Sequence, residues 1–146
     1  MKISATQVIR APREQVFSAL QDPAILQRCI DGCQRLVRAA DGSFDVELKL
    51  GVGMIKGAYK GKVELRDLKR PESFTLTIDG KGLTGIIKSK AVVRLSENNG
   101  ATTLVSEGEA VLGGLIASVG SRLLDGLSKK MTAEFFEKLA KAIESP

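Results

Sequence analysis

Two cysteines, Cys29 and Cys33, lie close together in the stretch CIDGC, and their spacing raises the question of metal or redox chemistry. A tetrahedral zinc site or a redox pair usually separates two cysteines by two residues, whereas three residues separate these. The chain contains no other cysteine and no histidine, so no further sulfur or imidazole ligand can complete such a site. The pair is interpreted as two small apolar residues beside the end of a helix, and no metal site is predicted.

Four glycines fall within LGVGMIKGAYKGKVEL, residues 50–65, and raise the question of phosphate binding. A phosphate-binding loop has the spacing GxxxxGK followed by Ser or Thr, or GxGxxG between a strand and a helix. Here the spacing differs and a strand pattern follows, so phosphate binding is not predicted. Gly51 and Gly53 are expected in a turn, whereas Gly57 and Gly61 are expected at bulge or cavity-wall positions of a strand.

Acid–base or nucleophilic catalysis needs titratable side chains that face one another, and the sequence supplies few candidates. Strand alternation places no carboxylate and no lysine on the inner face of the predicted sheet, where Tyr59, Ser89 and Ser106 are the only polar side chains. A serine nucleophile needs a neighbouring base, and the chain has no histidine. Tyr59 is interpreted as a structural hydrogen-bonding residue. No catalytic residue is predicted, and a binding protein is favoured over an enzyme.

The elements that position these residues follow from hydrophobic periodicity. A strand is expected over residues 2–10, a short helix opening at Pro12, and a second short helix that begins at Asp22 and Pro23. Six strands follow, at about 34–39, 43–50, 55–67, 72–80, 85–96 and 101–112, and then a long helix over about 114–143. The order β-α-α-β6-α predicts an α+β fold in one domain, residues 1–146, with a curved seven-stranded antiparallel sheet around the C-terminal helix.

Small residues interrupt the larger aliphatic ones on the inner face of this sheet. Protein interiors pack at crystal-like density, so such a wall either lets another backbone approach or leaves a space. Since the long helix can approach only part of a curved sheet, an apolar cavity is expected between sheet and helix. Its predicted lining residues are Leu48, Tyr59, Gly61, Val63, Leu76, Ile78, Ala91, Ser106, Gly108, Ala110, Ile116, Val119, Leu123, Leu127 and Met131.

Three glycine-rich apolar connections, GVGMI, GKGLTGII and VLGGLIA, are expected at one end of the sheet, because alternate turns of an antiparallel meander lie at opposite ends. Their apolar residues are predicted to form a cavity mouth: Met54, Ile55, Leu83, Ile86, Leu112 and Leu115. Two interpretations stay open, a ligand gate that touches a membrane or a lid folded over the core. Lys56, Lys81 and Lys88 flank these connections and suit anionic lipid head groups.

Composition limits the partners and the location. The net charge of +5 favours an acidic surface, such as an anionic membrane or an acidic protein. Nucleic acid is not expected, because aromatic residues make up only 4% of the chain and do not alternate with basic residues as stacking platforms would. No apolar run has the length of a signal peptide or a membrane span, so a cytoplasmic protein is expected, with peripheral contact at the inner face of the cell membrane left open.

Three segments of the sequence resemble the family of the G subunit of carbon monoxide dehydrogenase: APREQVFSALQDPAILQRCIDGC, GMIKGAYKGKVELRDLKRPESFTL and GSRLLDGLSKKMTAEFFEKL. The resemblance spans essentially the whole chain. It implies a helix-grip fold with an apolar cavity, as in START domains, the birch-pollen allergen and polyketide cyclases. It also implies a non-catalytic accessory of molybdenum hydroxylases of the carbon monoxide dehydrogenase type. The family commonly has proline between the two cysteines, where this chain has Asp31.

The residues and the resemblance together predict a non-enzymatic carrier or accessory protein. Its ligand would be an apolar molecule, a quinone or a lipid, held in the cavity between sheet and helix. The protein would link a carbon-monoxide-dehydrogenase-type molybdenum hydroxylase to the membrane or to its electron acceptor, and no cofactor is expected. Two alternatives stay open, an assembly or interaction factor with a vestigial cavity and a cyclase-like enzyme that uses Tyr59.

Overall fold

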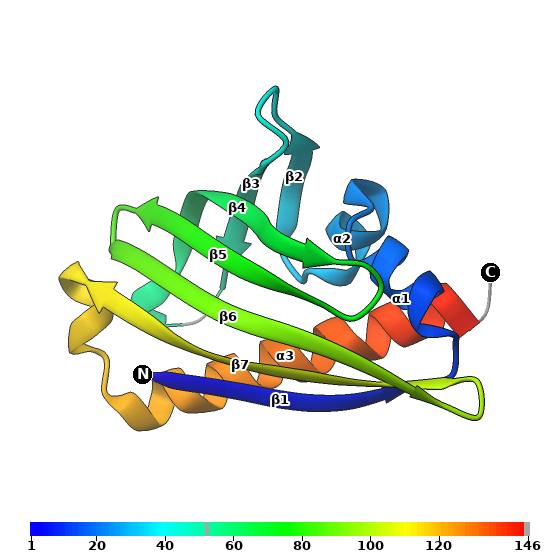
Figure 1. Cartoon of the computed structure of the whole chain (residues 1–146). Coiled ribbons are helices and arrows are strands. Elements are labelled where there is room, and N and C mark those ends of the chain that lie inside the picture. Colours follow the sequence, from blue (N-terminus) through cyan, green and yellow to red (C-terminus); the bar gives the residue numbers. More distant parts are fainter. Residues whose placement is uncertain (52, 145–146) are drawn as a thin grey trace.

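The computed structural model describes residues 1–51 and 53–144, and for Met54 the main chain only (Figure 1). The elements in chain order are β1 (Lys2–Ile9), α1 (Arg13–Ala19), α2 (Pro23–Cys29), β2 (Cys33–Arg38), β3 (Phe44–Leu50), the short 3-10 helix η1 (Gly53–Ile55), β4 (Gly57–Lys69), β5 (Ser73–Gly82), β6 (Gly85–Asn98), β7 (Ala101–Gly113), the 3-10 helix η2 (Gly114–Ser118) and α3 (Ser121–Glu144). The predicted α+β class and the order β-α-α-β6-α are confirmed, with η1 and η2 in the glycine-rich connections.

The seven strands form one antiparallel sheet in the order β1-β7-β6-β5-β4-β3-β2. Strands β2 to β7 follow one another as a meander, and β1 joins the sheet at its far edge by pairing with β7. In Figure 1 the sheet curves around α3, while α1 and α2 lie near the C-terminal end of that helix. This is the helix-grip arrangement, in which a curved sheet buries its inner face against one long helix.

Local sequence signals account for the two short helices. The backbone of Pro12 is extended, and α1 begins at the next residue. The Asp22 side chain accepts a hydrogen bond from the amide of Ala24 at 3.0 Å, and Pro23 occupies the first position of α2. A side-chain acceptor at the cap and a proline at the first helical position both favour helix initiation, so the predicted start of α2 is confirmed.

The main core lies where α1 and the C-terminal half of α3 pack against the sheet. It is built from completely buried or nearly completely buried side chains. The largest of them include Ile9, Val16, Phe17, Leu104 and Leu139. Phe17 and Phe74 contact each other edge to face, with ring centroids 5.7 Å apart. This core fixes α1 and the second half of α3 on the sheet.

A second apolar cluster lies at the glycine-rich end of the sheet. Its buried members are Ile55, Tyr59, Ile116 and Val119, with Leu48, Leu50, Leu112, Leu124 and Leu127 packed against them. These residues come from η1, η2 and the residue that follows it, strands of the sheet and the N-terminal half of α3. The cluster therefore fills the space between sheet and helix at this end.

Candidate ligand-binding cavity

A cavity of about 370 Å³ lies between the inner face of the sheet and α3. Small-molecule sites typically measure roughly 300–1,000 Å³, so this volume is at the lower end of the range. The sheet supplies Ile3, Ala5, Leu36, Phe44, Val63, Leu65, Phe74, Leu76, Ile78, Ser89, Ala91, Val93, Leu104 and Ser106. The helices and their flanking residues supply Leu20, Leu26, Ile30, Asp31, Ser128, Met131, Thr132, Phe135 and Phe136.

Six of the residues predicted to line a cavity do line this one: Val63, Leu76, Ile78, Ala91, Ser106 and Met131. The strand register explains why the sheet residues come together. Val63 pairs with Ile78, and Leu76 pairs with Ala91, so inward-facing residues form continuous rows across β4, β5 and β6. Met131 faces them from the middle of α3.

Five other predicted lining residues belong to the second apolar cluster instead. They are Leu48, Tyr59, Ile116, Val119 and Leu127. Strand alternation predicted Leu48 and Tyr59 on the inner face of the sheet, and the helical period predicted the other three on the face of the long helix, but none of the five lines the cavity. The physical reason is that η1 and η2 contribute Ile55 and Ile116 to a buried apolar cluster at the glycine-rich end, and these five residues pack within it.

The remaining four predicted lining residues have differing environments, all outside the cavity. A Cβ atom on Gly108 would lie 2.1 Å from the carbonyl oxygen of Lys90 and 2.7 Å from the Cβ of Ala91, so this glycine permits a close approach of β6 and β7. Ala110 is buried, whereas Leu123 on α3 is half exposed. Gly61 lines a hollow on the opposite face of the sheet.

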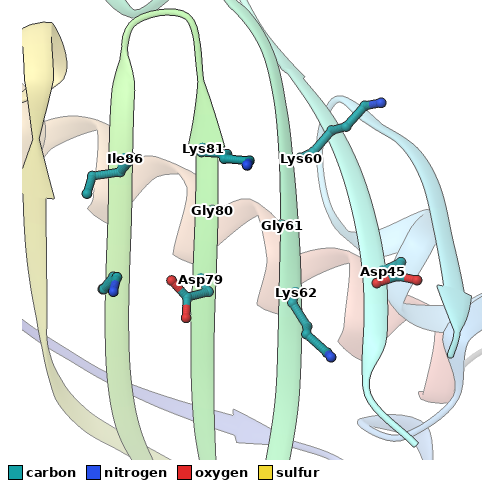
Figure 2. Close-up of a pocket in the computed structure, with 9 residues that line it drawn as sticks. Asp45, Lys60, Gly61, Lys62, Asp79, Gly80, Lys81 and Ile86 are labelled. Atoms are coloured by element: carbon teal, nitrogen blue, oxygen red, sulfur yellow. The ribbon is translucent and has the colours of Figure 1, made fainter. Parts of the chain in front are cut away.

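That outer hollow measures about 480 Å³ and has Gly61 and Gly80, which pair with each other, as part of its lining (Figure 2). Charged side chains surround it: Asp45, Lys60, Lys62, Asp79, Lys81 and Lys88. The Lys62 ammonium lies 2.7 Å from the carboxylate of Asp41, and this hydrogen bond holds the pKa of Asp41 below its usual range. Both side chains are exposed, and exposed ion pairs contribute little to stability. The hollow is therefore a solvated charged surface.

Of the six residues predicted to form a mouth, the five whose side chains are described do not surround the cavity. Ile55 is completely buried and Leu112 packs against the same second cluster, which agrees with a lid folded over the core. Leu83 is fully exposed, and Ile86 and Leu115 are about half exposed. The side chain of Met54 lies outside the described residues. None of the five described side chains lines the cavity.

The hydroxyl of Tyr59 connects several segments at the glycine-rich end. It donates a hydrogen bond to the carbonyl oxygen of Ile55 at 2.7 Å and forms a second, short one with the hydroxyl of Thr84. The carbonyl oxygen of Thr84 accepts from the amide of Ile116 at 2.7 Å. Through these bonds β4, η1, the turn between β5 and β6, and η2 are held together. Tyr59 therefore has a structural position, outside the cavity.

Replacing Tyr59 by phenylalanine is expected to destabilise the fold by about 1–2 kcal/mol, because the buried carbonyl of Ile55 and the hydroxyl of Thr84 both lose their partner. The free energy of unfolding, measured in urea, checks this value. The affinity for a ligand in the cavity is expected to stay unchanged, since the ring lies in the second cluster. A stable variant that no longer binds ligand would instead place Tyr59 at the binding site.

At the α2 end the cavity is closed by residues that the sequence analysis did not predict to line it. They are Leu20, Leu26, Ile30, Asp31 and Leu36. Leu26 lies on α2, and Ile30 follows the last residue of the helix with an extended backbone, so a helical period alone does not place both at the cavity. Asp31 follows them, with its Oδ1 atom 3.9 Å from the Nζ atom of Lys138 on α3. This exposed ion pair lies between the α2 end and the long helix.

Neither cysteine lines the cavity. Cys29 is buried in the main core, Cys33 is half-buried at the start of β2, and both are free thiols. Burial raises the pKa of both thiols, so the reactive thiolate form is disfavoured at neutral pH. Their surroundings agree with the interpretation of two small apolar residues.

Within the described residues, no helix combines the length and the apolar character needed to cross a bilayer. No curated protein sequence gives a significant match to this chain.

Solved structures with the same fold are numerous. A conserved protein from Geobacillus kaustophilus is 31% identical, with 99% of this chain and 95% of that chain covered and a TM-score of 0.94. A protein from Mycobacterium smegmatis is 16% identical, with 99% and 91% covered and a TM-score of 0.72. Ara h 8.0201 is 13% identical, with 100% and 99% covered and a TM-score of 0.72. The last two similarities concern the fold alone.

The sequence itself identifies the family. Residues 6–144 match the family described as CoxG, the G subunit of carbon monoxide dehydrogenase. The match contains all three segments that carry the resemblance, and it runs from β1 to the end of α3. This chain belongs to the CoxG family of carbon monoxide dehydrogenase G subunits.

Proposed function

We propose that this protein is a non-enzymatic carrier that holds an apolar molecule, a quinone or a lipid, in the cavity between the sheet and α3. The observation that carries the proposal is the cavity itself, about 370 Å³ of space with predominantly aliphatic and aromatic walls. Burying apolar surface contributes roughly 25 cal/mol per Å², so an apolar ligand gains affinity from such walls without specific polar contacts. The family implies association with carbon monoxide dehydrogenase. The ligand would serve that molybdenum hydroxylase as electron acceptor or as a link to the membrane.

The polar groups of the cavity support a carrier over a cyclase-like enzyme. The lining contains three serines, one threonine and Asp31, and the chain has no histidine that could act as a general base. Tyr59, the residue on which a cyclase-like reaction would depend, holds the second cluster together at a distance from the cavity lining. The accessory role that family membership implies is in keeping with this inventory.

The carrier proposal is tested by the ligand content of the protein. Protein purified without detergent is analysed by native mass spectrometry, and a solvent extract of the same sample is analysed for apolar molecules. We expect one quinone or lipid molecule bound to each protein molecule. If the purified protein is empty, we expect it to take up an added short-chain quinone. An unchanged mass at saturating quinone and lipid would contradict the carrier and favour an assembly factor for the same enzyme.

Peripheral contact with the inner face of the cell membrane is part of the same proposal. Leu83 and Leu115 are exposed, and they lie on neighbouring segments because the amide of Ile116 donates to the carbonyl of Thr84. Lys81 is two residues from Leu83 and its charge suits anionic lipid. Exposed leucines beside a lysine favour this end of the molecule as the membrane-contacting surface.

Replacing Leu83 and Leu115 together by serine is expected to reduce co-flotation with anionic liposomes by more than tenfold. Each leucine contributes roughly 1.5–3 kcal/mol to membrane binding when its side chain is fully removed from water. Both side chains are exposed and are therefore able to insert into lipid. Val8→Ser, an exposed position in β1 at the edge of the sheet, is the control and is expected to leave flotation unchanged. If the double variant floats like the unmodified protein, the membrane contact proposed here does not exist.

A further inference from the structure

The polar side chains that line the cavity carry no positive charge. They are Asp31, Ser89, Ser106, Ser128 and Thr132. Neither lysine nor arginine is among the described lining residues, and the chain has no histidine. Whatever polar group a ligand brings into this space therefore meets hydroxyls and one carboxylate.

Two of the hydroxyls, those of Ser89 and Ser106, lie on the sheet wall among apolar neighbours. Ser89 of β6 pairs with Ile78 of β5 and with Ala110 of β7. Ser106 of β7 pairs with Val93 and Ala5 in the strands on either side. Both serines are half-buried and both line the cavity.

Within residues 1–51 and 53–144, neither serine hydroxyl is hydrogen-bonded to another protein group. The side-chain hydrogen bonds of the neighbouring strands involve other residues, such as Thr102, whose hydroxyl donates to the carbonyl of Ala11 at 2.7 Å. Both hydroxyls are open to the cavity, since no buried side-chain oxygen of the described residues lacks a partner. A ligand oxygen in the cavity would supply a partner, because a serine hydroxyl can donate to a carbonyl or accept from an alcohol.

An anionic head group has no such partner at the sheet wall. A buried carboxylate or phosphate is strongly unfavourable unless a cation pairs with it, and the described wall residues offer none. At the α2 end the cavity is lined by Asp31, whose exposed carboxylate adds negative charge. The ammonium of Lys138 lies 3.9 Å from that carboxylate, so this exposed ion pair supplies no net positive charge for an anionic head group.

The volume of the cavity limits how much of a long ligand it can enclose. A cavity of about 370 Å³ is at the lower end of the range for small-molecule sites. It can enclose a head group with a short stretch of chain, and the rest of a long polyprenyl or acyl chain would extend out of it. The two serines inside the cavity therefore favour a ligand that enters with its oxygen-bearing end.

We propose that this cavity selects apolar molecules with a neutral oxygen-bearing end, a ketone, quinone or alcohol, which Ser89 and Ser106 hold by hydrogen bonds. Carboxylates and phosphates of the same chain length are disfavoured. This inference rests on the proposed carrier function, because it names the chemical class of the molecule carried.

The test compares four probes of one medium chain length: a methyl ketone, an alcohol, a carboxylate and an alkane. Each displaces a neutral fluorescent apolar dye from the protein at neutral pH. The ketone and the alcohol are expected to bind at least about tenfold more tightly than the carboxylate. The affinity for the carboxylate is expected to rise as the pH falls toward its pKa, because protonation removes the charge.

Substitutions assign the preference to the two serines. Ser89→Ala and Ser106→Ala are each expected to lower the affinity for the ketone about fivefold and to leave the affinity for the alkane unchanged. Threonine at either position keeps the hydroxyl and is expected to keep the preference. Ser96→Ala, at an exposed position of the same strand β6, is the matched control and should have no effect.

A carboxylate that binds as tightly as the ketone at neutral pH would overturn the inference, and so would serine-to-alanine variants that bind the ketone normally. In both cases the probes still bind, and the carrier function stands. If neither the dye nor any of the four probes binds the protein, the carrier function itself fails and the inference fails with it.

Discussion

Replacing Ala91 by phenylalanine is expected to lower the affinity for an apolar ligand by at least tenfold while the fold remains intact. Ala91 lies in the middle of β6, is only 8% exposed, and lines the cavity between its register partners Leu76 and Gly108. A Cβ atom added at Gly108 would lie 2.7 Å from the Cβ atom of Ala91, so the space beside Ala91 on the β7 side is narrow and a longer side chain is expected to extend into the cavity. A phenylalanine ring would occupy a large part of the 370 Å³ that the ligand needs.

The stability of this variant separates a cavity from a packed core. Overpacking a filled core costs about 1–3 kcal/mol, whereas a ring that fills empty apolar space is expected to leave the melting temperature unchanged or to raise it. Binding is measured by dye displacement and stability by thermal unfolding on the same sample. Val111→Phe, which adds a ring at an exposed position in β7, is the control. A lowered melting temperature with normal binding would mean that no ligand occupies this region.

Replacing Leu139 by alanine is expected to destabilise the protein by about 2–5 kcal/mol. Leu139 on α3 is completely buried in the main core, where it packs with residues of α1 and the sheet. Removal of its side chain loses apolar burial and leaves a void where α1, α2 and the sheet pack against α3. This loss is a large part of the roughly 5–15 kcal/mol that typically stabilises a folded domain.

Urea unfolding at equilibrium measures this loss. Leu123→Ala on the same helix provides the comparison, because Leu123 is half exposed and its replacement is expected to cost less than about 1 kcal/mol. The two leucines share one helix and one chemistry, so burial is the difference between them. Equal losses in the two variants would show that the C-terminal half of α3 does not pack on the sheet in solution.

Local patterns in the sequence predicted the order and the type of the elements. Apolar residues recur every two positions in the strands and about every 3.6 positions in α3. Both periods follow from the local geometry of the backbone, so a short stretch of sequence is enough to detect them. Asp22 and Pro23 mark the start of α2 for the same reason, since a cap acts within one turn. The inventory of side chains also limited the chemistry, because a chain without histidine and with two cysteines offers few catalytic or metal-binding groups.

The position of the cavity along the sheet depended on the tertiary structure. Alternation predicts that Tyr59, Gly61 and Val63 face the same side, but it says nothing of how far the helix lies from each of them. The structure separates the three, with Tyr59 in the second cluster, Gly61 beside the outer hollow and only Val63 in the cavity wall.

Small residues illustrate the same limit. Gly108 and Ser106 are two positions apart on β7 and both suggested open space, yet Gly108 accommodates the close approach of β6 while Ser106 faces the cavity. Leu26, Ile30 and Asp31 come from a segment far away in the sequence and close the cavity at the α2 end. Periodicity is a local property of the chain, whereas the gap between sheet and helix is set by sheet curvature and by contacts between segments distant in sequence. The sequence therefore indicated most of the residues that face inward, with Leu123 as an exception, and only the tertiary packing decided which of them border empty space.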